Sequence, residues 1–183
     1  VFRPSAQQEE VIHYWNFNQL SQLLPPSFTR LEAGINPELS PGGSGELTAD
    51  DGEGFTAVNG VFGDGPGTHL RINNPLKALL TFDLPTTGYK NPVFRYETRR
   101  SGQGAGIQVV SVSLNGSDFM EIRRLIVKDD NPELVVLDLR SLAAAANNPL
   151  FKIRIAFEQG EGGTAGNNRF DNVTLSGTPA SDV

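Results

Sequence analysis

Arginine side chains recur at alternate positions of short segments rich in β-branched and aromatic residues. Such alternation places them on one face of a strand, and a guanidinium group binds a carboxylate or sulfate through two parallel hydrogen bonds. If these strands are neighbours, the basic residues form a stripe that would bind an anionic polysaccharide. The alternative is that they form cross-strand ion pairs with Glu97 and Glu158. The stripe comprises Arg71, Arg95, Arg99, Lys152 and Arg154, and the predicted ligand-binding residues are Arg71, Arg95, Glu97, Arg99 and Arg154.

A run of acidic residues lies in the long irregular segment 19–54. Glu46, Asp50, Asp51 and Glu53 fall close together there. Carboxylate oxygens beside backbone carbonyl groups suit Ca²⁺, a hard cation that takes about six to eight oxygen ligands. The spacing is not that of an EF-hand loop, and the alternative is a solvated acidic surface loop.

Several kinds of enzyme are excluded by the residues that the chain lacks. It has no Cys, which excludes thiolate zinc sites, disulfides and cysteine nucleophiles. It has two His and no Gly-x-Ser-x-Gly motif, so a serine triad has little support. The glycine-rich segment 102–106 lies between two predicted strands, whereas a nucleotide-binding motif leads into a helix. Paired carboxylates of a glycoside hydrolase or lyase stay open, because the distance between them decides that chemistry; Glu97, Asp138 and Glu158 fall on strands.

Composition indicates one ordinary globular domain. The 183 residues are 38% hydrophobic and 20% charged. The formal net charge is -6 and the pI is about 4.9, whereas nucleic-acid-binding domains usually carry a basic face and a high pI. No stretch approaches the roughly 18 consecutive apolar residues of a membrane span. We therefore expect neither nucleic-acid binding nor insertion into a membrane.

The positioning elements are short strands separated by frequent turn signals. About eight to ten of them predict an all-β fold, an antiparallel β-sandwich with jelly-roll topology. Repeated helical crossovers, which a parallel sheet needs, are missing. One short helix is predicted near 141–147, capped by Ser141 and favoured by the alanines. A short strand pair is predicted over 55–62, with Asn59-Gly60 as its turn.

Domain bounds follow from the same pattern. Residues 1–10 are predicted to be an N-terminal lead-in, residues 11–177 the β-sandwich domain, and residues 178–183 a C-terminal tail. Trp15 shares a strand face with apolar neighbours, so we expect it in the core rather than stacked on a sugar.

The two ends of the chain carry a resemblance. The opening YWNFNQL and the closing GNNRFDNVTLSG, with TGYKNPVFRYETRRSG and IQVVSVSLNGSDF between them, resemble secreted bacterial jelly-roll domains. That group includes carbohydrate-binding modules and laminin-G-like domains. The resemblance implies that the first and last strands lie side by side, with termini adjacent.

The resemblance also implies a structural Ca²⁺ between the loops of these two strands. The acid of the closing strand corresponds to Asp171, and the acid of the opening strand corresponds to Asn18, whose amide oxygen carries no charge. Asp50 or Asp51 would then supply the missing charge. The alternative needs no metal: Asp171 would accept hydrogen bonds from backbone amides of the opening strand.

The predicted function is a noncatalytic, secreted or cell-surface module that binds a polysaccharide and neighbours other domains of a larger protein. One alternative is a structural or adhesion domain of a surface protein. The other is a polysaccharide lyase or glycoside hydrolase on the same scaffold, since a fold alone does not define a function.

Overall fold

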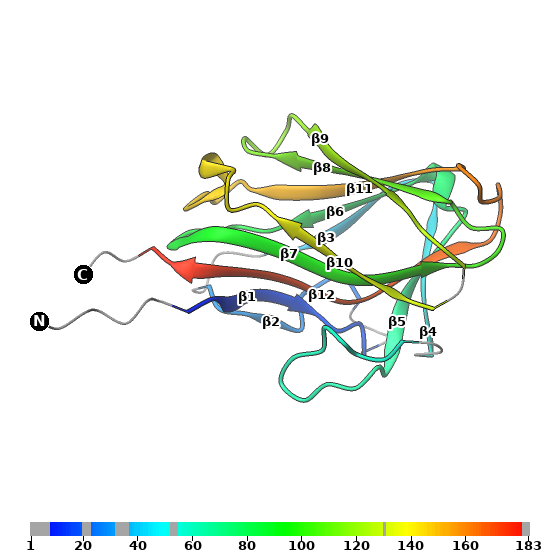
Figure 1. The fold of residues 1–183 in the computed structure, drawn as a ribbon, viewed down its shortest axis with the longest axis horizontal. Coiled ribbons are helices and arrows are strands. Elements are labelled where there is room, and N and C mark those ends of the chain that lie inside the picture. Colours follow the sequence, from blue (N-terminus) through cyan, green and yellow to red (C-terminus); the bar gives the residue numbers. More distant parts are fainter. Residues whose placement is uncertain (1–7, 20–22, 32–36, 52–54, 130, 181–183) are drawn as a thin grey trace, which may run out of the picture.

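The computed structural model describes residues 8–19, 23–31, 37–51, 55–129 and 131–180, without the side chains of Asp50 and Asp51. Two antiparallel sheets pack face to face in a jelly-roll sandwich (Figure 1). This confirms the predicted all-β fold. Within the described ranges, no helix is both long and apolar enough to cross a bilayer.

The seven-stranded sheet has the order β10-β7-β12-β1-β2, and β5 with β4 also joins β12. The five-stranded sheet has the order β3-β6-β11-β8-β9. The strands of the larger sheet are β1 (Glu10–Trp15), β2 (Phe28–Thr29), β4 (Glu46–Asp51), β5 (Thr68–Asn73), β7 (Tyr89–Arg100), β10 (Glu133–Asp138) and β12 (Asn167–Pro179). Those of the smaller sheet are β3 (Leu39–Gly43), β6 (Ala78–Asp83), β8 (Ile107–Ser113), β9 (Met120–Ile126) and β11 (Lys152–Glu158).

The first and last strands of the sandwich are hydrogen-bonded neighbours, as the resemblance implied. Trp15 of β1 pairs with Val173 of β12, and Glu10 pairs with Gly177 in the same antiparallel ladder. The long strand β12 is also the partner of β7 along its other edge. β12 therefore lies between the first strand, β1, and the long strand β7 in the larger sheet.

A chain of aromatic rings fills the space between the sheets. Trp15, which is fully buried as predicted, packs edge-on against Phe82, and Phe82 packs against Phe94. Tyr96 continues the chain to Phe170 of β12. Rings of this size dominate the apolar area removed from water, so the core fixes which face of β7 and β12 points inward.

Two local predictions differ from the structure. The predicted helix near 141–147 is a single 3₁₀ turn, Ala143–Ala145, and no side chain caps it. So few residues cannot offset the cost of helix nucleation. Residues 55–62 contain no strand pair. Instead, the Asn59 side chain bonds to the backbone of the larger sheet, which holds this segment as a loop.

Candidate functional site

The outer face of the seven-stranded sheet carries most of the polar side chains predicted to bind a ligand. Phe94 and Tyr96 of β7 point into the core. Successive side chains of a strand point to opposite faces. Arg95, Glu97 and Arg99 therefore lie on the outer face.

Three arginines form a row across this face, which we call the arginine row. Arg169 of β12 lies directly opposite Arg71 of β5 on one side and opposite Arg99 of β7 on the other. Strands lie about 4.8 Å apart, so the row spans roughly 10 Å. All three side chains are half-buried. Arg169 Nε also donates to Asn167 Oδ1 at 2.9 Å. Like charges directly opposite each other repel, so the row concentrates positive charge on this part of the face.

The arginine row overlaps the predicted basic stripe only in part. Arg71 and Arg99 belong to both. Arg169 was missed, although its neighbour Phe170 is apolar and strand parity would have placed Arg169 outward. The predicted single stripe does not form, because Lys152 and Arg154 lie on β11 of the other sheet. There Arg154 stacks over the Phe119 ring at 4.0 Å.

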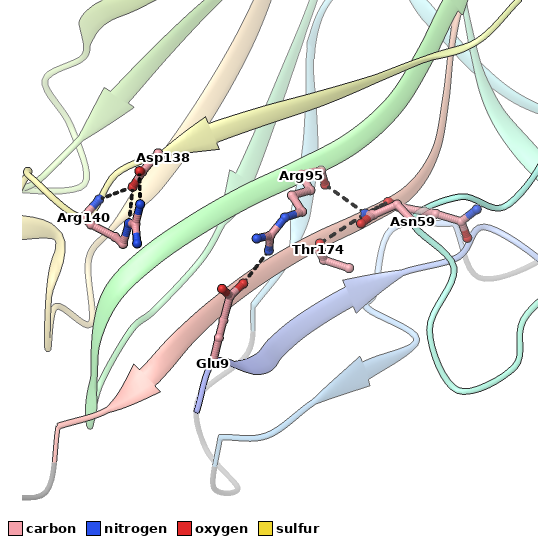
Figure 2. Close-up of polar contacts among 7 residues, drawn as sticks. Glu9, Asn59, Arg95, Asp138, Arg140 and Thr174 are labelled. Atoms are coloured by element: carbon pink, nitrogen blue, oxygen red, sulfur yellow. Dashed lines mark hydrogen bonds and ion pairs between the residues drawn. The ribbon is translucent and has the colours of Figure 1, made fainter. Parts of the chain in front are cut away.

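Ion pairs account for two other predicted residues. Arg95 bonds the Glu9 carboxylate, with Arg95 Nη1 and Glu9 Oε1 2.5 Å apart (Figure 2). Glu158 of β11 pairs with Arg124 of β9, across the intervening strand β8 of the smaller sheet. Glu158 therefore forms an ion pair, but with an arginine outside the predicted stripe, and Glu97 receives its hydrogen bonds from amide groups.

Glu97 is one half of a buried carboxyl pair, together with Asp171 directly opposite on β12. Glu97 is 1% exposed and Asp171 is 0% exposed. Glu97 Oε2 accepts bonds from the Asn172 side-chain amide (2.8 Å) and the Asn59 backbone N–H (3.2 Å). Glu97 Oε1 and Asp171 Oδ2 have no hydrogen-bond partner among the described residues.

Burial raises the pKa of Asp171 to about 9, and the negative charges of Glu97 and Asp64 add to the shift. The backbone N–H of Asn172 donates to Asp171 Oδ1 and opposes that shift. Neither carboxyl of the pair can reach a glycosidic bond while both are buried, so the pair does not have the access that a glycosidase needs.

The third acidic candidate on a strand is neutralised at the surface. Asp138 accepts two bonds from the Arg140 guanidinium group, at 2.6 and 2.8 Å (Figure 2). These bonds lower the pKa of Asp138 to about 2. A carboxyl that stays ionised down to that pH is unsuited to act as a general acid.

Residues 55–67, called the anchored loop below, fix one side of this face. The Asn59 side-chain amide donates to the Asn172 carbonyl oxygen (2.6 Å) and to Thr174 Oγ1 (3.2 Å). Figure 2 shows Asn59 lying beside Thr174 and Arg95. No pattern in the sequence distinguishes this Asn from an ordinary turn residue.

The predicted calcium ligands fit a metal only in part. Asp171 Oδ2 is a buried carboxylate oxygen of the kind that a cation would satisfy. In contrast, Asn18 Oδ1 already accepts the backbone N–H of Thr68 (2.9 Å). Among the described side chains, which exclude Asp50 and Asp51, no three acidic or His residues form a metal-binding group. Calcium binding stays a prediction, and Asp171 is the residue that fits it.

The alternative role proposed for Asp171 also differs in detail. Its backbone donor is Asn172, the next residue on β12, rather than an amide of the opening strand. The termini are held together by the β1–β12 ladder itself.

The fold is a jelly-roll β-sandwich of the kind found in carbohydrate-binding modules and adhesin domains. The chain is similar to a CBM22 xylan-binding domain from Paenibacillus barcinonensis, at 7% identity and a TM-score of 0.59 over 97% of this chain and 100% of that one. It is also similar to a family 22 carbohydrate-binding module of Clostridium thermocellum, at 14% identity and a TM-score of 0.50 over 84% and 92% of the two chains.

An adhesin domain of Lys-gingipain from Porphyromonas gingivalis matches at 8% identity and a TM-score of 0.56, over 92% of this chain and 97% of that one. The sequence matches no family model and no curated protein. At these identities the likeness establishes the fold, and the function is argued from the site.

Proposed function

We propose that this chain is a noncatalytic module that binds an acidic polysaccharide along the outer face of its seven-stranded sheet. The observation that carries the proposal is the arginine row, in which Arg71, Arg169 and Arg99 face one another on adjacent strands. Guanidinium groups held on adjacent strands suit a long polymer, because binding to them needs no ordering of a loop. Guanidinium groups supply bidentate contacts for carboxylate or sulfate groups.

The comparisons support the polysaccharide part of the proposal. One neighbour in structure is described as a xylan-binding domain, and another has a cleft that takes part in ligand binding. The charge of the row is this chain's own feature and supports an acidic rather than a neutral polymer. We further propose a location outside the cell or on its surface, beside other domains, and a structural calcium ion held by Asp171.

The noncatalytic part rests on the buried carboxyl pair. Glu97 and Asp171 are the pair of carboxyl groups on this face that most resembles a catalytic pair, and both are buried away from solvent. A side chain that cannot contact the glycosidic oxygen cannot protonate it.

Binding is tested by affinity electrophoresis and titration calorimetry with polygalacturonate, a sulfated galactan and neutral xylan. We expect retardation by an acidic polymer, weakened by salt because the contacts are electrostatic. Polygalacturonate alone would identify carboxylate recognition, and the sulfated galactan alone would identify sulfate recognition. Arg99→Ala and Arg169→Ala should each weaken binding about tenfold or more, while Arg154→Ala on the other sheet should not.

Three results would count against the proposal. Binding to none of the polymers would favour a structural or adhesion domain. An activity that releases sugar fragments and persists through purification would favour a hydrolase or lyase. If Arg154→Ala weakens binding as much as Arg99→Ala does, the binding site does not lie on this face alone.

A further inference from the structure

The anchored loop is rigid in the structure because of its own turns. The Ala57 carbonyl accepts the backbone N–H of Gly60 at 2.9 Å, and the Val61 carbonyl accepts that of Asp64 at 3.1 Å. Within the first of these turns, Asn59 bonds to the sheet. The loop therefore presents its remaining side chains in fixed positions.

Two of those side chains are apolar and exposed to solvent. Val58 and Phe62 are each 65% exposed. Phe62 also has φ +55°, a left-handed backbone conformation that costs a residue with a Cβ roughly 1–2 kcal/mol. A strained backbone that holds an aromatic ring in water is the kind of feature found at binding sites.

Neighbouring rings fix the orientation of Phe62. Its ring centroid lies 4.9 Å from that of Phe28 and 6.2 Å from that of Tyr14, and both contacts are edge-to-face. Tyr14 and Phe28 are themselves paired across β1 and β2. The three rings form an aromatic shelf, with Phe62 as its exposed member.

A polar cleft of about 210 Å³ has Ser27, the residue before Phe28 of the shelf, in its lining. Drug-sized ligands occupy pockets of roughly 300 Å³ or more, so this cleft suits a single sugar ring rather than a longer stretch of polymer. The cleft is lined by Asn16, Gln19, Pro25, Pro26 and Ser27.

The cleft and the shelf are connected through shared neighbours. Ser27 precedes Phe28 in the chain, and its hydroxyl donates to Asn16 Oδ1 at 2.8 Å. The Asn16 side-chain amide in turn donates to Asp64 Oδ2 at 2.8 Å, two residues beyond Phe62. Amide and hydroxyl groups already held in place can bond sugar hydroxyls without further ordering.

We propose that the aromatic shelf and this cleft form a sugar-binding subsite separate from the arginine row. The apolar face of a pyranose ring would pack on Phe62, and its hydroxyls would bond Asn16 and Ser27. This inference rests on the proposed glycan-binding function, and it adds contacts to the neutral part of the sugar that the arginines do not supply.

The test compares Phe62→Asn, Phe62→Tyr and the control Val58→Ala, which alters an equally exposed apolar residue of the same loop. Asn adopts the left-handed conformation readily, so Phe62→Asn should fold with an unchanged or higher melting temperature. Its affinity should fall about tenfold, whereas Phe62→Tyr and Val58→Ala should bind like the wild type. The probes are xylohexaose and polygalacturonate, and each variant is measured on the one that the wild type binds.

The outcomes separate the two proposals. Wild-type affinity in a folded Phe62→Asn variant would overturn the subsite and leave the arginine row standing. An equal loss of affinity in Val58→Ala would also overturn it, because a general change in the loop would then explain the effect. A wild type that binds neither probe nor any other glycan would overturn both.

Discussion

Asp171 of β12 and Glu97 of β7 lie directly opposite each other, with both carboxyl groups buried beside the anchored loop. Burial raises the pKa of Asp171 to about 9, and the negative charge of Glu97 adds to the shift. Asp171 therefore holds a proton at neutral pH, or a cation binds in its place. The two states give different dependences of stability on pH.

If the pair holds a proton, stability should fall as pH rises. The pKa of Asp171 is about 9 in the folded protein and near 3.8 when unfolded, so between these values the folded state binds the extra proton. The free energy of unfolding should then decline by about 4 kcal/mol between about pH 5 and 8. Urea unfolding at several pH values measures this slope in the presence of a chelator.

Asp171→Asn should remove most of that slope, because an amide does not titrate. The exposed residue Asp118 offers the control Asp118→Asn, which should keep the wild-type slope. Equal slopes in the wild type and Asp171→Asn would show that Asp171 is ionised throughout.

Calcium should produce the opposite behaviour if it binds at Asp171. Calcium at a hundredfold excess over its dissociation constant should stabilise the fold by about 2.7 kcal/mol. The gain should grow with pH, since the ion replaces the proton. Differential scanning fluorimetry with calcium and with EDTA measures it, and Asp171→Ala should abolish it. Matching melting temperatures with calcium and with EDTA would mean that a proton alone neutralises the pair.

Strand parity was enough to predict the direction of individual side chains. The alternation around Phe94 and Tyr96 put Arg95 and Arg99 on the outer face, where they lie. Parity does not tell which strands become neighbours, so it could not show that Arg154 lies on a different sheet from Arg95 and Arg99. Pairing depends on long-range contacts between residues far apart in the sequence.

Which polar side chains are buried was harder to predict than which face of the sheet they point to. Glu97 has the parity of a solvent-facing residue, but the anchored loop covers it through Asn59. The ladder between β12 and β7 also shifts register between Asp171 and Thr174, where Asn172 adopts a left-handed conformation. Such a bulge redirects side chains, and the local sequence FDNV contains no pattern that predicts it.

His13 should destabilise the fold in acid. Its Nε2–H donates to the Pro85 carbonyl at 2.8 Å, and its Nδ1 lies 3.0 Å from the Thr29 hydroxyl, which can donate to Nδ1 when the ring is neutral. Burial lowers the pKa of His13 to about 4, against 6.5 in the unfolded chain. The stability that the neutral ring contributes is present above pH 6.5 and is lost as pH falls toward 4, by about 3 kcal/mol.

Nuclear magnetic resonance titration measures that pKa directly, because the chain has only two His. His13→Gln should flatten the acid limb of the stability curve. A His13 resonance that titrates near 6.5 would show that water reaches the ring.

Arg99→Thr should separate stability from binding. It removes one charge from the arginine row, and Thr suits a strand, so the free energy of unfolding should rise by about 0.5 kcal/mol. The same change should weaken binding to an acidic polysaccharide about tenfold, because one bidentate contact is lost. Arg154→Thr, a matched change on the other sheet, should leave binding intact and lose its contact with Phe119. Urea unfolding and calorimetry on the same samples give both quantities. If Arg99→Thr lowers stability and leaves binding unchanged, the row is a structural feature rather than a binding surface.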